Sequence, residues 1–137
     1  MKIAVRYFSR SGNTKKLGNA IANALGTQAE SCNSPLDGKV DLLFLGGSVY
    51  GGDLDKNLQK FIENLEPENV KSVVLFGTSA IALKPYKKME KELMKKNIPV
   101  SPERFFCRGS FAILHRGRPN AEDLALASKF AGNMVNN

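Results

Sequence analysis

Apolar residues occur in short, almost unbroken runs along this 137-residue chain. Runs of this kind are typical of strands covered on both faces, as in a parallel sheet. We therefore predict strands at Ile3–Val5, Val40–Leu45, Val70–Phe76 and Arg104–Phe111. Glycines follow the second and third of these runs, and they indicate that a loop begins there.

Between the runs, apolar residues recur every three or four positions, which is the spacing of one helix face. The first helix is predicted to end at Gly26, which readily takes the left-handed conformation of a helix end. The last helix follows Pro119, with Asn120 as its N-cap and Asp123 as its capping partner. The apolar stripes of the four helices are Leu17, Ile21, Ala24 and Leu25; Leu54, Leu58, Phe61, Ile62 and Leu65; Tyr86, Met89 and Leu93; and Leu124, Ala127, Ala131 and Met134.

Strands that alternate with helices predict an α/β fold with parallel strands and right-handed crossovers. A second strand must lie between Gly26 and Val40, and only Thr27–Cys32 can form it. The turn formers that follow are too few for a normal crossover helix, so we predict that this helix is reduced to one turn or absent. A single domain is expected over residues 1–137, since no linker or internal repeat interrupts the chain.

The segment between the first strand and the first helix, Tyr7-Phe8-Ser9-Arg10-Ser11-Gly12-Asn13-Thr14, is rich in hydroxyl groups. It leads into a helix N-terminus, where unpaired N–H groups and the helix dipole attract an anion. Hydroxyls at Ser9, Ser11 and Thr14 suit a terminal phosphate monoester. A Walker lysine and a G-x-G-x-x-G pattern are both missing, which argues against P-loop nucleotides and dinucleotides. A plainer alternative is that Ser11, Asn13 or Thr14 only caps the helix.

Two more loops, Gly47–Asp53 and Gly77–Leu83, follow strands whose carboxyl ends would be neighbours. With Ser9–Thr14, they resemble the three flavin loops of flavodoxins in order and spacing, over nearly the whole chain. The resemblance implies a flavodoxin-like, doubly wound, five-stranded parallel sheet of order 2-1-3-4-5, in three α/β/α layers, that binds FMN at the carboxyl ends of its strands. The cofactor-binding residues that it implies are Ser9, Arg10, Ser11, Gly12, Asn13, Thr14, Ser48, Val49, Tyr50, Gly51, Gly52, Thr78, Ser79 and Ala80, with no catalytic or metal-binding residue.

The second and third loops have chemistry that suits a flavin ring. Tyr50 could stack on the isoalloxazine, or pack under a loop. Gly51-Gly52 could let a carbonyl turn toward the ring N5, or form a plain tight turn. Thr78 and Ser79 could hydrogen-bond the pyrimidine edge, or cap the next helix. Flavodoxins usually supply a second aromatic from the third loop, but here Ala80–Leu83 is aliphatic, so one flavin face would be open to a substrate or partner.

The formal net charge is +7, and residues 71–118 alone carry +8. Flavodoxins that act as electron carriers tend to be acidic, so this chain is expected to meet a partner with an acidic docking patch. Glutamates lie among the lysines, and no nucleic-acid-binding motif accompanies them, so we expect no nucleic-acid partner.

No membrane-spanning run is present, and Met1-Lys2 leads directly into a strand rather than a signal peptide. Cys32 and Cys107 lie far apart and have no metal-ligand spacing, which favours free thiols in a reducing cytoplasm.

We therefore expect an FMN-binding protein that transfers one or two electrons to a redox partner protein or a small-molecule acceptor. An alternative is an FMN-dependent NAD(P)H:quinone or flavin reductase, in which Arg116 and Arg118 would meet a nicotinamide cofactor phosphate. A flavodoxin-fold binding module without flavin is a further alternative. A phosphoacceptor receiver domain is excluded because Phe8-Ser9 and Gly46-Gly47 stand where it needs acidic residues, and a low-molecular-weight phosphatase is excluded because its loop cysteine is missing.

Overall fold

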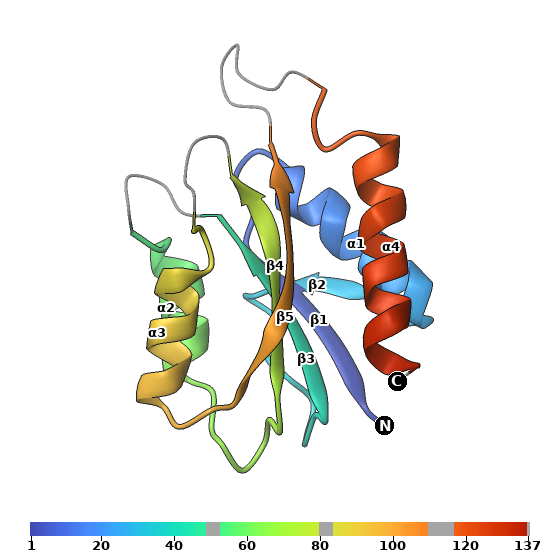
Figure 1. The fold of residues 1–137 in the computed structure, drawn as a ribbon. Coiled ribbons are helices and arrows are strands. Elements are labelled where there is room, and N and C mark those ends of the chain that lie inside the picture. Colours follow the sequence, from blue (N-terminus) through green and yellow to red (C-terminus); the bar gives the residue numbers. More distant parts are fainter. Residues whose placement is uncertain (49–52, 80–83, 110–116, 137) are drawn as a thin grey trace.

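A computed structural model describes residues 1–48, 53–79, 84–109 and 117–136 of the chain. Within these residues, five strands form one fully parallel sheet of order β2-β1-β3-β4-β5 (Figure 1). This confirms the predicted fold class and strand order. The strands are β1 (Ile3–Tyr7), β2 (Ala29–Ser31), β3 (Leu42–Gly47), β4 (Val73–Ser79) and β5 (Val100–Arg108).

Helices cover both faces of the sheet and produce two apolar cores (Figure 1). On one face, α1 and α4 pack on the strands around Phe44 and Phe76. On the other face, α2 and α3 pack around Leu43 and Leu75. Within the described residues, none of the helices combines the length and the apolar character that crossing a bilayer requires. The helices are α1 (Asn13–Leu25), α2 (Lys56–Glu63), α3 (Lys87–Lys95) and α4 (Ala121–Val135).

Two of the predicted helix ends have the expected geometry. Gly26 ends α1 in the left-handed conformation, with φ of 71°, and its N–H donates to the carbonyls of Ala22 and Asn23. At the start of α4, the Asn120 side chain accepts from the Asp123 N–H, and the Asp123 carboxylate accepts from the Asn120 N–H. The capping box predicted from sequence is therefore confirmed.

The strands do not end where the glycines predicted. β3 and β4 continue through Gly46-Gly47 and Gly77, and β5 begins four residues earlier than expected. Close packing explains the glycines: a Cβ on Gly46 would lie 2.3 Å from the Phe76 ring, and a Cβ on Gly77 would lie 1.9 Å from the Gly47 carbonyl oxygen. These glycines let neighbouring groups approach, rather than breaking the strands.

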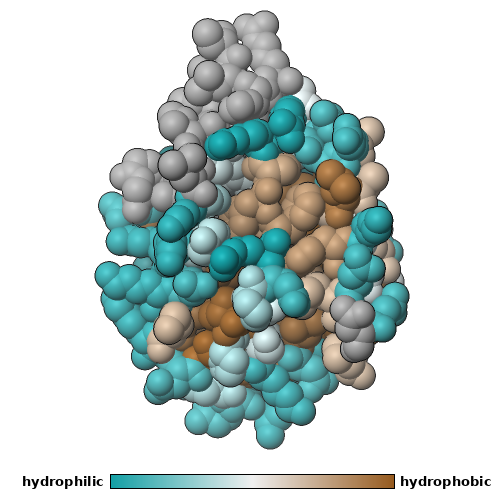
Figure 2. Space-filling model, in the orientation of Figure 1, coloured by the Kyte–Doolittle hydropathy of each residue, from teal (hydrophilic) through white to brown (hydrophobic). Residues whose placement is uncertain are grey.

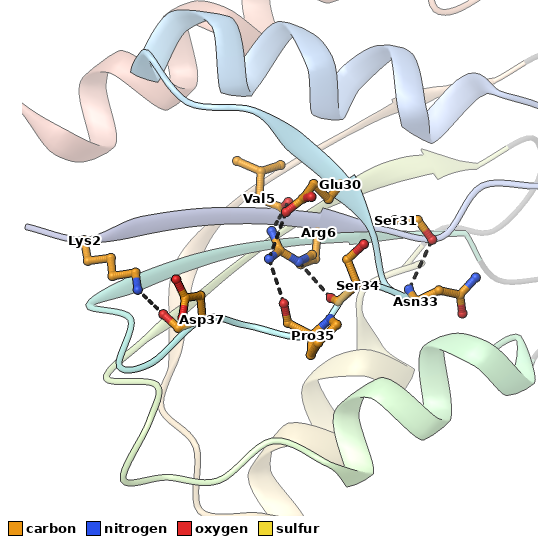
Figure 3. Close-up of polar contacts among 9 residues, drawn as sticks. All are labelled: Lys2, Val5, Arg6, Glu30, Ser31, Asn33, Ser34, Pro35 and Asp37. Atoms are coloured by element: carbon orange, nitrogen blue, oxygen red, sulfur yellow. Dashed lines mark hydrogen bonds and ion pairs between the residues drawn. The ribbon is translucent and has the colours of Figure 1, made fainter.

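The connection from β2 to β3 has no helix, as predicted, and a buried arginine holds it instead (Figure 3). The Arg6 guanidinium donates to the carbonyls of Val5, Ser34 and Pro35 at 3.1, 3.0 and 3.0 Å. It also lies 3.1 Å from the Glu30 carboxylate. One side chain on β1 thus satisfies the Ser34 and Pro35 carbonyls of the connection, which a crossover helix would have satisfied internally.

The close approach at Gly77 predicts a large difference between two glycine substitutions. Gly77→Ala forces a methyl group against a backbone carbonyl that no side-chain rotation can move, and we expect it to lower the free energy of unfolding by about 3 kcal/mol. Gly132→Ala, inside α4 with open space around its Cα, should raise it by about 1 kcal/mol. Urea denaturation of both variants provides the measurement, and equal effects would contradict the packing at Gly77.

The role of Arg6 predicts that lysine cannot replace it. A single ammonium cannot reach all three carbonyls, so Arg6→Lys should lower the free energy of unfolding by about 1–3 kcal/mol. Lys39→Arg, at an exposed position in the same connection, is the matched control and should change stability by less than about 0.5 kcal/mol. An equally small change in the free energy of unfolding for both variants would show that the guanidinium contacts do not hold the connection.

Candidate functional site

Three buried hydroxyl groups meet at the carboxyl edge of the sheet, near the ends of β1, β3 and β4. Thr14 Oγ1 lies 3.0 Å from Ser48 Oγ and 3.2 Å from Thr78 Oγ1, and the last two atoms are 3.0 Å apart. Each of these residues comes from a different predicted flavin loop, and each is at most 8% exposed. We call these residues the hydroxyl triad. It joins segments that are 30 to 64 residues apart in the sequence.

A ring of three hydroxyls satisfies its own hydrogen bonds, because each can donate once and accept once. Burial makes these bonds matter, since a buried hydroxyl without a partner costs about 1–3 kcal/mol. The triad therefore holds the starts of the three loops at fixed separations. Gly109, after β5, closes the same region: a Cβ there would lie 2.9 Å from Thr78 Cβ and 3.0 Å from the Asn13 amide nitrogen.

The first loop places its remaining hydroxyls on its own backbone. Ser9 Oγ accepts from the Gly12 N–H at 3.0 Å, and Ser11 Oγ accepts from the Asn13 N–H at 3.4 Å. Gly12 occupies the N-cap position of α1 with φ of 90°, and it has no side chain to cap the helix. The first turn of α1 also contains no acidic residue. The positive end of this 13-residue helix thus faces the loop without a carboxylate of its own turn.

Arg10 connects the first loop to the start of α2. Its Nη2 lies 3.0 Å from Asp55 Oδ2, while Asp55 Oδ1 accepts from the Asn57 N–H at 2.8 Å and so caps the helix. Burial raises the pKa of Asp55, but hydrogen bonds from the Asn57 backbone and from Arg10 outweigh it, so the pKa lies below its ordinary value. Asp55 was not among the predicted site residues. An aspartate near the start of the helical stripe that begins at Leu54 was the available signal for a cap.

Part of the predicted site lies outside the described residues. Val49, Tyr50, Gly51 and Gly52 of the second loop belong to this part, and so does Ala80 of the third. The predicted residues that the structure describes do gather at one edge of the sheet: Ser9, Arg10, Ser11, Gly12, Asn13, Thr14, Ser48, Thr78 and Ser79.

The donor set at this edge fits a phosphate monoester. It combines hydroxyls, the Asn13 amide, an arginine and the N-terminus of a helix, all of which stabilise an anion. These observations agree with the chemistry of a flavin that carries a terminal phosphate.

A sequence model of the flavodoxin domain matches residues 4–129, which is most of the chain. The chain belongs to the flavodoxin family. A flavodoxin-like domain-containing protein, BilS of Clostridioides difficile, is 32% identical over 123 residues, which cover 82% of this chain and 68% of that protein. An uncharacterised protein of Methanocaldococcus jannaschii is 25% identical over the full length of both chains.

The solved structure of a flavodoxin from the domain Archaea has the same fold, with a TM-score of 0.76 and 18% identity over 99% of this chain and 97% of that one. Together, the family and the fold support a flavin-binding, electron-transferring role for this flavodoxin.

In this flavodoxin, Asp55 both caps α2 and pairs with Arg10, and substitution can separate these two functions. Asp55→Asn keeps an N-cap acceptor but removes the ion pair with Arg10, so the free energy of unfolding at neutral pH should fall by less than about 0.5 kcal/mol. Asp55→Ala removes both and should cost about 1 kcal/mol. The lowered pKa of Asp55 adds stability that is present at neutral pH and is lost as the pH falls through that lowered value.

Urea denaturation from neutral to acidic pH measures both effects. The wild-type chain should lose this contribution in acid, and the Asn variant should lack this part of the pH dependence. An Asn variant as unstable as the Ala variant at neutral pH would show that the charge, and not the cap, is the main function of this side chain.

Proposed function

We propose that this flavodoxin binds FMN and passes one or two electrons through it, as one domain over residues 1–137 that acts in the cytoplasm. The observation that supports this most directly is the hydroxyl triad, because it brings the phosphate loop and both ring loops to one point at the carboxyl edge of the sheet. The free thiols of Cys32 and Cys107 are consistent with a reducing compartment.

At the phosphate end, the residues that would hold FMN are Ser9, Arg10, Ser11, Gly12, Asn13 and Thr14. The hydroxyls and N–H groups of Ser9 to Asn13 would exchange some of their present hydrogen bonds for bonds to phosphate oxygens. Thr14 is 1% exposed and hydrogen-bonded within the triad, so it would support the loop from its buried side. Arg10 already has a carboxylate partner in Asp55, and would add a screened attraction from the rim.

At the ring end, Ser48, Val49, Tyr50, Gly51 and Gly52 would form one wall, and Thr78, Ser79 and Ala80 the other. FMN, when bound, supplies the one- and two-electron chemistry, and the protein positions it. Tyr50 would stack on the ring, and the glycines beside it would let the peptide adapt to the ring edge. Because residues 80–83 are aliphatic rather than aromatic, one flavin face would be open to a redox partner protein or a small-molecule acceptor.

The reductase alternative assigned Arg116 and Arg118 to a nicotinamide cofactor phosphate, and Arg116 lies outside the described residues. Arg118 Nε and Nη2 instead donate to the Asp123 carboxylate at 2.9 and 2.7 Å, and Asp123 is 5% exposed. An incoming phosphate would have to displace a well-placed carboxylate, which favours electron transfer to a partner over a nicotinamide reaction. Cys107, in the neighbouring strand, is not a candidate nucleophile, because burial raises the pKa of its thiol to about 11.

The assignment of the phosphate loop predicts a selective loss of affinity. Ser11→Ala, at an exposed position, should weaken FMN binding by about tenfold, the effect of about 1.5 kcal/mol for a hydrogen bond to a charged group. Riboflavin lacks the phosphate and should bind the variant as well as the wild type. Tyr50→Ala should instead weaken both ligands similarly and restore part of the fluorescence of the bound flavin. Fluorescence titration of each flavin is the measurement.

Ser101→Ala, at the start of β5 and at the opposite end of the sheet, is the matched control and should bind both flavins normally. Absence of flavin binding in the wild type would refute the proposed function. Equal losses of FMN and riboflavin in Ser11→Ala would refute only the assignment of this loop to the phosphate.

A further inference from the structure

β5 is the edge strand beside the third flavin loop, and it is covered less completely than its neighbours. Among the described residues, it pairs on one side only, with β4. Every residue of β3 is buried, whereas every residue from Arg104 to Arg108 of β5 is partly exposed. An edge strand of this kind is a template on which another strand can pair.

The hydrogen-bond pattern identifies which backbone groups face outward. The Gly109 N–H donates to the Ser79 carbonyl of β4 at 3.3 Å. Because successive residues of a strand alternate, the backbone groups of Phe105 and Cys107 also face β4, and those of Arg104 and Phe106 face away from it. Pro102, earlier in β5, has no N–H, so pairing along this edge is favoured only after it.

A groove runs along this part of β5. It has a volume of about 410 Å³, and apolar side chains of Phe105, Phe106 and Leu126 line it. Leu126 is 50% exposed and extends the apolar surface of the groove. Figure 2 shows this apolar surface over β5, bordered by hydrophilic side chains. Ser79, the last residue of β4, also lines the groove, so an occupant would lie next to the third flavin loop.

Of Arg104, Phe106 and Arg108, whose backbone groups face outward, two carry basic side chains. The Arg104 guanidinium stacks on the Tyr86 ring, with 3.5 Å from its central carbon to the ring centroid, and the Lys87 ammonium lies 5.9 Å from the same ring. Of the acidic side chains around this register, Glu90 pairs with Arg104 and Asp123 pairs with Arg118. Glu103, exposed and next to Arg104 on β5, belongs by alternation to the other face of the strand. Arg108 adds another positive charge on the same face as Arg104 and Phe106.

A second copy of this chain is a poor occupant for this edge. A two-fold antiparallel pairing centred on Phe106 would place Arg104 of one copy opposite Arg108 of the other, twice. Like charges directly opposite each other destabilise a strand pair. The same arrangement favours an incoming strand of opposite charge.

We infer that the edge of β5 from Arg104 to Arg108 binds an extended segment of a partner protein as an added strand. The segment carries two acidic residues at alternate positions on either side of an apolar residue. The acidic residues lie opposite Arg104 and Arg108, and the apolar residue lies opposite Phe106. The inference goes beyond the proposed function and does not need a bound flavin, because no residue of Ser9–Thr14 takes part.

A synthetic peptide of threonines in which two glutamates flank a valine at alternate positions serves as the probe. It should slow amide hydrogen exchange at Arg104 and Phe106, detected by NMR, while the amides of Phe105 and Cys107, which already face β4, change little. The same peptide with N-methyl groups on the amides of the pairing register should bind at least about tenfold more weakly. A lysine-for-glutamate peptide should not bind detectably. The experiment is run without and with FMN, so its result is independent of flavin binding.

Charge reversal in the protein provides a second measurement. Arg108→Glu should weaken the glutamate peptide roughly fivefold or more and allow the lysine peptide to bind. Lys87→Glu should shift the preference in the same direction, and Lys39→Glu, in the β2–β3 connection at the far edge, should not. The inference would be overturned if the N-methylated peptide bound as tightly as the unmethylated one. It would also be overturned if the peptide protected successive amides of β5 from exchange equally, without alternation. Exchange at Phe106 that slows with protein concentration alone would overturn it too, since a second copy would then occupy the edge.

Discussion

The site of this flavodoxin depends on a contact between two backbones. At the end of the sheet, Gly77 of β4 lies so close to the Gly47 carbonyl that no side chain fits between them. Gly46 leaves room in the same way for the Phe76 ring of the core. Because β3 and β4 meet without intervening side chains, the residues that follow, Ser48 and Thr78, come within 3.0 Å of each other and reach Thr14. Core packing and loop position are therefore one constraint, and the position of the hydroxyl triad follows from the packing of the sheet.

Much of the fold could be predicted because its signals are local. Apolar runs and helical stripes gave the order of the elements, and the Asn120–Asp123 capping box was readable as a pair of residues three apart. The strand ends were not readable in this way. A glycine after an apolar run looks the same whether it starts a loop or admits a neighbouring carbonyl, and only the tertiary contact at Gly77 distinguishes the two. The early start of β5 was hidden by Pro102, which an edge strand tolerates and an inner strand does not.

For the candidate site, sequence reasoning proposed a set of residues but not the contacts between them. Ser9, Ser11 and Thr14 were selected for the same reason, their hydroxyls, yet two bond to the loop backbone and the third lies in the triad. The pair formed by Arg10 and Asp55 spans 45 residues, and it could not be derived from either residue alone. Contacts between distant segments depend on the register of the whole sheet, so they appear only once the fold is known.

The connection held by Arg6 has a consequence for motion. β2 has three residues, and among the described strands it pairs only with β1, so it is the smallest unit of the sheet that can open separately. Local opening of this edge would break the contacts of one guanidinium and expose Cys32, which is 6% exposed in the closed form. Burial raises the pKa of this thiol, so the closed form keeps it both covered and protonated. The rate at which Cys32 reacts with a thiol reagent therefore reports how often this edge of the sheet opens.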